Sequence, residues 1–184
     1  MRKILLGIDP GDKYSGIIIF EEGKIQQGDN IENEKLFSLI DQLTLFDKEV
    51  KLEVAYEDIR PFTSRFNMNT INTIKMIGRL EYILGQRMVS YKSITRNEVK
   101  NWIYNRYYGI SLPLVMQKIQ KSNKKRKDGS DRRPSFVYVD DRIVILAMKS
   151  HWAIDVRKGG KTPLGIKKHA WQALAAATFY LESV

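Results

Sequence analysis

The 184-residue chain contains no cysteine. The absence of thiols excludes disulfide bonds and metal sites built on thiolates, and it fits a reducing compartment. No stretch reaches the ~20 consecutive apolar residues of a membrane-spanning helix. The N-terminal residues 1–6 lead directly into a predicted strand and lack the apolar length of a secretory signal. We therefore expect a cytoplasmic, intracellular protein that has no membrane partner.

Acidic residues are few relative to basic ones. The chain has 21 Asp and Glu against 31 Lys and Arg, which gives a formal net charge of +10. An excess of this size favours a polyanionic partner such as nucleic acid. Eight of the basic residues lie close together: Lys118, Lys121, Lys124, Lys125, Arg126, Lys127, Arg132 and Arg133. A solvated surface loop is one interpretation, but the position of this segment inside the chain favours a loop that grips phosphates.

The length and an apolar fraction of 43% predict a single domain over residues 1–184. The least regular stretch runs from about 109 to 135 and contains Pro113, Gly129 and Pro134. We interpret it as a basic insert that is mobile until it binds a partner.

Apolar periodicity predicts the order of secondary structure. Strands are expected at Lys3–Asp9, Tyr14–Glu21, Lys24–Gln27, Leu52–Glu57 and Val89–Ile94. Helices are expected at Asn33–Phe46, with Asn33 as the cap, at Met68–Gln86, from a capping box at Thr95–Glu98, at Tyr138–Trp152 and at Ile166–Leu181. This order predicts an α/β protein with a mixed five-stranded sheet. A three-strand meander is followed by βα units, and helices cover both faces, as in the RNase H-like fold.

Two predicted strands end in acidic residues. Asp9 ends the first strand just before a Pro-Gly turn, and Glu57 ends the fourth. A strand that is buried seldom carries a charge without a partner, and a metal ion is one such partner. Either acid alone is more simply explained as a turn or a solvated strand end. Because both strands end in this way, the pair favours a shared metal site. Asp140 and Asp141 are expected instead to interact with a helix N-terminus.

The last predicted helix carries His169 and Gln172, which are three residues apart and would share one face. Ala173 and Ala176 extend that face with small side chains, so the helix could lie close against the sheet. A single histidine in an amphipathic helix is usually structural. Here it follows two strands that end in acids, which favours a functional role.

Taken together, these segments resemble the RuvC family of Holliday-junction resolvases. The resemblance rests on residues 7–11 with Ser15-Gly16, on Tyr56-Glu57, on residues 96–100, and on residues 169–177. These segments occur in order over nearly the whole chain. The opening motif is shared by many RNase H-like proteins, whereas the ordered set is more specific.

The resemblance implies a homodimer that binds four-way DNA junctions and nicks two strands symmetrically with the help of Mg²⁺. It assigns catalytic roles to Asp9, Glu57, His169 and Gln172, with two Mg²⁺ ions held by Asp9, Glu57 and His169, and with Mn²⁺ as a possible substitute. The family normally has aspartate where this chain has Gln172. A glutamine offers a neutral oxygen rather than a charge, so weaker metal binding is expected.

The segment after Glu57 is a candidate DNA contact. Phe62 and Phe66 could stack on bases or pack in the core, and Arg60 and Arg65 could bind phosphate. Two alternatives to junction resolution stay open. One is an RNase H-like nuclease that acts on flaps or RNA–DNA hybrids, and the other is a non-catalytic protein that binds branched DNA through a degraded site.

Overall fold

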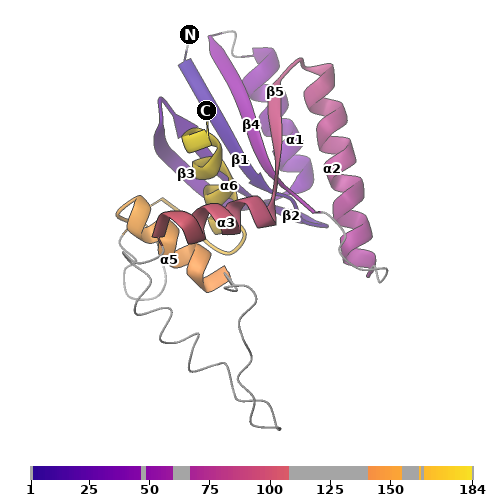
Figure 1. Cartoon of the computed structure of the whole chain (residues 1–184). Helices are drawn as coiled ribbons and strands as arrows, with labels where there is room; N and C mark the ends of the chain where they lie inside the picture. The colour runs from indigo at the N-terminus through magenta and orange to yellow at the C-terminus, as the bar shows by residue number, and fades with distance from the viewer. Residues whose placement is uncertain are drawn as a thin grey trace.

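The computed structural model describes residues 2–46, 49–59, 67–107, 141–154, 162 and 164–183. Five strands form one sheet in the order β3-β2-β1-β4-β5 (Figure 1). They are β1 (Arg2–Asp9), β2 (Tyr14–Glu21), β3 (Lys24–Glu32), β4 (Val50–Asp58) and β5 (Ser90–Thr95). The first three strands pair antiparallel, whereas β4 runs parallel to both β1 and β5. The predicted meander followed by βα units is confirmed.

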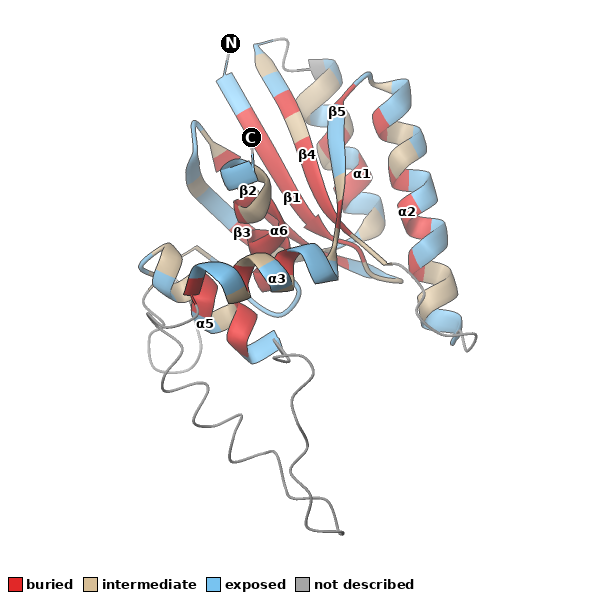
Figure 2. Ribbon diagram, in the orientation of Figure 1, coloured by how far each residue is buried: buried red, intermediate tan, exposed pale blue. Residues whose placement is uncertain are grey.

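Helices cover both faces of this sheet, as predicted. They are α1 (Asn33–Asp41), which continues as the π-helix η1 (Gln42–Phe46), then α2 (Met68–Gln86), α3 (Arg96–Tyr107), α5 (Asp141–His151) and α6 (Ala170–Ser183). Strand side chains alternate between the faces. Leu6 and Ile8 of β1 therefore pack with α1 and α2, whereas Leu5 packs in a second core with α3, α5 and α6. Figure 2 shows that β1 and β4 are buried along most of their length.

Small residues let α6 lie directly on the sheet. A Cβ atom added to Gly7 of β1 would be 2.7 Å from the carbonyl oxygen of Ala173 and 2.7 Å from the Cβ of Ala177. A Cβ atom on Gly16 of β2 would be 2.2 Å from the carbonyl carbon of His169. The close approach expected from the alanine-rich helix therefore occurs, and glycines on the strands complete it.

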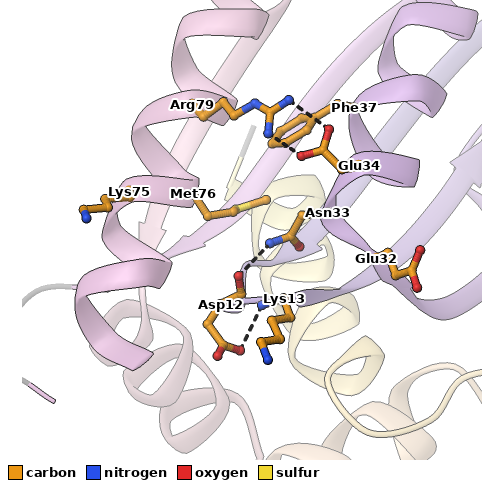
Figure 3. A pocket seen from close by; sticks show the side chains of 9 residues that line it. All are labelled: Asp12, Lys13, Glu32, Asn33, Glu34, Phe37, Lys75, Met76 and Arg79. Carbon is orange, nitrogen blue, oxygen red and sulfur yellow. Dashed lines mark hydrogen bonds and ion pairs between the residues drawn. The ribbon is translucent and has the colours of Figure 1, made fainter. Parts of the chain in front are cut away.

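Two local predictions are corrected by the fold. Asn33 does not cap α1, whose N-cap is Glu32. The Asn33 side chain instead accepts a hydrogen bond from Ser15 and donates to the carbonyl oxygen of Gly11. It also donates to the carbonyl oxygen of Asp12 (Figure 3), so it connects α1 to the turn between β1 and β2. The third strand was expected to end at Gln27, before a Gly-Asp-Asn sequence. It continues to Glu32 because pairing with β2 outweighs the weak strand propensity of these residues.

Other boundaries agree closely with prediction. Helix α2 spans Met68–Gln86 as expected, and the side chain of Asn67 accepts a hydrogen bond from the backbone N–H of Thr70. The capping box that begins α3 is present, since Glu98 accepts hydrogen bonds from the backbone N–H and the hydroxyl of Thr95. Within the described ranges, no helix has the length and apolar character that crossing a membrane requires.

Candidate active site

Asp9 and Glu57 lie side by side at one edge of the sheet. The parallel register of β1 and β4 pairs Ile8 with Tyr56, so the residues that follow stand at the same level. Side chains at matching positions of parallel strands point to the same face. For Asp9 and Glu57 this is the face that α6 covers, because Leu5 and Ala55, four and two residues earlier, belong to that core. Asp9 is 9% exposed and Glu57 is 5% exposed.

Burial and a neighbouring negative charge shift the pKa of Glu57. Burial and the neighbouring charge of Asp9 raise the pKa of the Glu57 carboxyl to about 7. The positive charges of Arg96 and Lys100 offset part of this effect, while Asp141 adds to it. Like charges and desolvation are the conditions under which carboxyl groups shift their pKa at functional sites.

His169, from the C-terminal part of the chain, contacts Asp9 near the N-terminus. Its Nδ1 is 2.8 Å from Oδ2 of Asp9, at the distance of an N–H that donates to a carboxylate. This hydrogen bond is the main reason that the pKa of His169 is raised above its usual value. With Nδ1 committed to Asp9, the Nε2 atom is the one left for a proton or a ligand, and 57% of the side-chain surface is exposed.

The helical placement of His169 was wrong. Helix α6 begins at Ala170, and His169 occupies the turn before it, where its carbonyl oxygen accepts hydrogen bonds from the backbone N–H groups of Gln172 and Ala173. The preceding residue, Lys168, has a φ of 47°, which breaks the predicted continuous helix. Gln172 is buried in the first turn of α6. Its catalytic role stays a prediction.

Arg96 is a residue that the sequence did not single out for the site. It is the first residue of α3, directly after β5, which is paired with β4. Its Nε atom is 3.5 Å from Oε1 of Glu57, and its Nη2 atom forms an ion pair with Asp141, the first residue of α5. Asp141 therefore pairs with a side chain in addition to lying at a helix N-terminus. The sequence feature that could have identified Arg96 is its position directly after β5, the strand that pairs with the Glu57 strand.

The donor set fits a hard divalent cation. Two buried carboxylates share one edge, and the pKa of Glu57 is raised first by burial and then by the neighbouring charge of Asp9. A bound cation would offset both effects. Among the described residues, no three His, Asp or Glu side chains already form a complete metal cluster. Magnesium usually retains several waters and also binds substrate phosphates, so two carboxylates are sufficient protein ligands.

The shifted pKa leads to a stability prediction for Glu57→Gln in metal-free protein. In the unfolded chain the Glu57 carboxyl has its usual pKa near 4.5, whereas in the folded chain its pKa is raised to about 7. The wild type therefore loses about 3 kcal/mol of stability from this group as pH rises through that interval. We expect Glu57→Gln to gain stability relative to wild type at pH 8 and little at pH 4.5, as measured by urea unfolding in EDTA.

Glu53→Gln is the matched control for this prediction. Glu53 lies four residues earlier on β4, is partly exposed and accepts a hydrogen bond from Tyr180. Because Glu53 pairs with Lys51 and is partly exposed, its replacement should not stabilise the protein. A stability difference for Glu57→Gln that is the same at pH 4.5 and pH 8 would contradict the account of the acid pair.

The residues predicted to contact DNA are not among those that the structure describes. The candidate DNA contacts Arg60, Phe62, Arg65 and Phe66, and the basic segment 118–133, lie outside the described residues. A pocket of about 430 Å³ lies between the β1–β2 turn, α1 and α2 (Figure 3). Arg79 and Glu34 form an ion pair across it, and the Arg79 guanidinium lies 4.3 Å from the centre of the Phe37 ring. Because this pocket contains none of the paired acids, we place the candidate active site at the sheet edge instead.

Comparison with known proteins gives structural matches. No family model matches the chain, and no curated protein matches it. The structure of Thermus thermophilus RuvC in complex with a Holliday junction substrate matches with a TM-score of 0.57 and 14% identity, over 98% of this chain and 96% of that chain. A second T. thermophilus RuvC structure matches with a TM-score of 0.56 and 17% identity, with the same coverage. The chain therefore has a RuvC-like fold, within the RNase H-like class.

Proposed function

We propose that this protein is a crossover junction endodeoxyribonuclease, which uses metal ions to resolve four-way DNA junctions by paired nicks. The observation that carries the proposal is the pair of buried carboxylates, Asp9 and Glu57, at the ends of adjacent parallel strands. The match to a junction-bound RuvC over nearly the full length of both chains supports it. The net charge of +10 supports a nucleic-acid substrate.

Hydrolysis of a phosphodiester requires attack by water on phosphorus, removal of a proton from that water and departure of an alkoxide oxygen. Two bound Mg²⁺ ions, or Mn²⁺ ions in their place, would supply the acidified water and would stabilise the developing charge. Asp9 and Glu57 would hold these ions. The Nδ1 of His169 contacts the Asp9 carboxylate and would fix its orientation, which leaves Nε2 as the nitrogen that could accept or return a proton.

Paired nicks on a junction with near two-fold symmetry require two sites, so we propose that the protein acts as a homodimer. Apolar side chains on and beside α2 are exposed and could contribute to the contact between subunits: Met68, Ile74, Tyr82, Met88 and Tyr91. The basic segment 118–133 would grip the phosphates, with Arg60, Phe62, Arg65 and Phe66 close to the junction centre.

Substrate preference tests this proposal. Wild-type protein is incubated with a synthetic four-way junction, a flap and an RNA–DNA hybrid, first in Mg²⁺ and then in Mn²⁺. We expect the junction to be nicked fastest, with no nicking in EDTA. Faster cleavage of the flap or the hybrid would favour the other RNase H-like activities. Tight junction binding without cleavage in either metal would favour a non-catalytic binding protein, the alternative suggested by Gln172.

Gln172→Asp tests the departure from the family pattern. A third carboxylate near Asp9 and Glu57 should tighten metal binding while adding repulsion when no metal is bound. We expect the variant to be less stable than wild type in EDTA, to gain more in melting temperature from Mg²⁺, and to reach its maximal cleavage rate at lower Mg²⁺. A magnesium-dependent shift in melting temperature equal to that of wild type would show that Gln172 is not close to the metals.

A further inference from the structure

Arg96 is held in a fixed place beside the two acids. Strand β5 is paired with β4 so that Ile94 stands beside Glu57 and Thr95 beside Asp58. The capping box of Thr95 and Glu98 then fixes the start of α3. The backbone of Arg96 is therefore set by a strand pairing on one side and a helix cap on the other.

The guanidinium makes a direct hydrogen bond to Asp141 and a longer ionic contact with Glu57. The Nε atom is 3.5 Å from Glu57 Oε1, which is longer than a direct hydrogen bond of 2.7–3.2 Å. The close contact is from Nη2 to Asp141, which is largely exposed and stands outside the acid pair. A side chain that served only to neutralise Glu57 would bond to it directly. The hydrogen bond to Asp141 instead holds the guanidinium beside Glu57 without a direct hydrogen bond to that acid.

The guanidinium also keeps donors for a ligand. Arginine has five N–H donors, and the two contacts above engage Nε and Nη2. No contact with another described residue engages Nη1. The side chain is 44% exposed, whereas that of Glu57 is 6% exposed. An anion that approached the acids from solvent would meet this cation first, and arginine binds phosphate oxygens through charge-assisted hydrogen bonds.

We propose that Arg96 contacts the substrate, and that its Nη1 donates to a non-bridging oxygen of the phosphodiester that is cleaved. Asp141 is a positioning residue that keeps the guanidinium in place. Because the reacting phosphate carries more negative charge in the transition state, this contact stabilises the transition state and also contributes one phosphate contact to binding. The inference rests on the proposed nuclease function and adds a site residue to it.

The test compares Arg96→Gln with Arg106→Gln. Arg106 is on the same helix, is similarly exposed and also pairs with an acid, Glu182. It lies ten residues further along α3, about 15 Å from Arg96. We expect Arg96→Gln to slow single-turnover junction cleavage on the order of 10- to 100-fold at saturating protein. In Ca²⁺ without cleavage, it should also reduce the slope of log affinity against log salt by about 0.9. Arg106→Gln should match wild type in both measurements.

Two further variants sharpen the outcome. Arg96→Lys keeps the charge and should recover part of the rate, and Asp141→Asn should lose less than Arg96→Gln because the guanidinium remains. A slower rate for Arg96→Gln with an unchanged salt slope would assign Arg96 to the support of Glu57 and overturn the phosphate contact, as would equal effects of Arg96→Gln and Arg106→Gln. Failure of the wild type to cleave any substrate would instead refute the proposed function, which separates the two failures.

Discussion

Replacing Asp9 with asparagine should abolish junction cleavage while junction binding stays nearly intact. The substitution keeps the size of the side chain but removes the charge that Glu57 senses and that His169 contacts at 2.8 Å. Because His169 contacts this carboxylate and Glu57 lies within reach of its charge, its loss should disable the proposed metal binding and release His169. We expect a rate decrease on the order of 10³-fold or more. Affinity should persist because it comes from Lys and Arg on phosphates.

Asp12→Asn is the matched control. Asp12 lies three residues further along, in the turn after β1, and its side chain accepts a hydrogen bond from the backbone N–H of Lys13 at 2.9 Å. Its replacement should leave cleavage near the wild-type rate. Binding is measured with labelled junction in EDTA, and cleavage is measured by single-turnover kinetics in Mg²⁺. Comparable cleavage by Asp9→Asn and wild type would contradict the proposed active site.

The second large effect concerns Gly16, which stands opposite Asp9 on β2. A Cβ atom there would lie 2.2 Å and 2.4 Å from the carbonyl carbon and oxygen of His169, and 2.5 Å from the nitrogen of Ala170. All three are backbone atoms that cannot rotate away. Gly16→Ala should therefore push the start of α6 off the sheet, lower stability by about 3 kcal/mol and separate His169 from Asp9. Urea unfolding measures the first effect, and loss of the elevated His169 pKa, followed by NMR titration, measures the second.

Gly78→Ala is the same substitution at another position and should raise stability instead of lowering it. Gly78 lies within α2, and a Cβ atom there would meet no other atom within 4 Å. Alanine in an exposed helix position is favoured over glycine by about 1 kcal/mol, so this variant should be more stable than wild type. If Gly16→Ala were as stable as wild type, the close contact between β2 and the start of α6 would be wrong.

Secondary structure that follows from the alternation of apolar and polar residues within one segment could be predicted from the sequence. The alternation of Leu52, Val54 and Tyr56 with Glu53 and Ala55 predicted β4 and placed Glu57 at its end, and the structure has that strand one or two residues longer at each end. The mixed sheet was predicted from the order of elements, whereas the pairing of the two acid-bearing strands, β1 and β4, is a finding of the structure.

The start of the last helix depends on contacts with residues distant in sequence, and it could not be predicted from local patterns. The last helix was expected from Ile166, since residues 166–168 have acceptable helix propensity. In the structure Ile166 is buried, and a Cβ atom on Gly28 would lie 2.7 Å from it. The backbone N–H of Gly28 also donates to the carbonyl of Leu164 at 2.8 Å. These contacts with β3 hold the segment extended, so the helix begins only at Ala170. Tertiary packing outweighs local propensity here.

The same limit applies to Arg96. Its charge is visible in the sequence, but its two partners come from β4 and α5, which are 39 residues before it and 45 residues after it. Only the three-dimensional arrangement brings the three together. Asp141, interpreted from sequence as a helix-dipole partner, gains its ion pair in the same way. Site residues at strand ends can be predicted from fold order, whereas residues that hold or assist them depend on packing between elements.

The central claim is that Asp9 and Glu57 form a metal-dependent site that nicks junctions in pairs. Its most direct test maps the nicks on a four-way junction labelled on each strand in turn, with wild type and with Asp9→Asn, in Mg²⁺ and in EDTA. We expect nicks at symmetry-related positions on two opposing strands, made by wild type in Mg²⁺ but not in EDTA. An intact junction after incubation with wild type in Mg²⁺ and in Mn²⁺, or identical nicks made by Asp9→Asn, would contradict it.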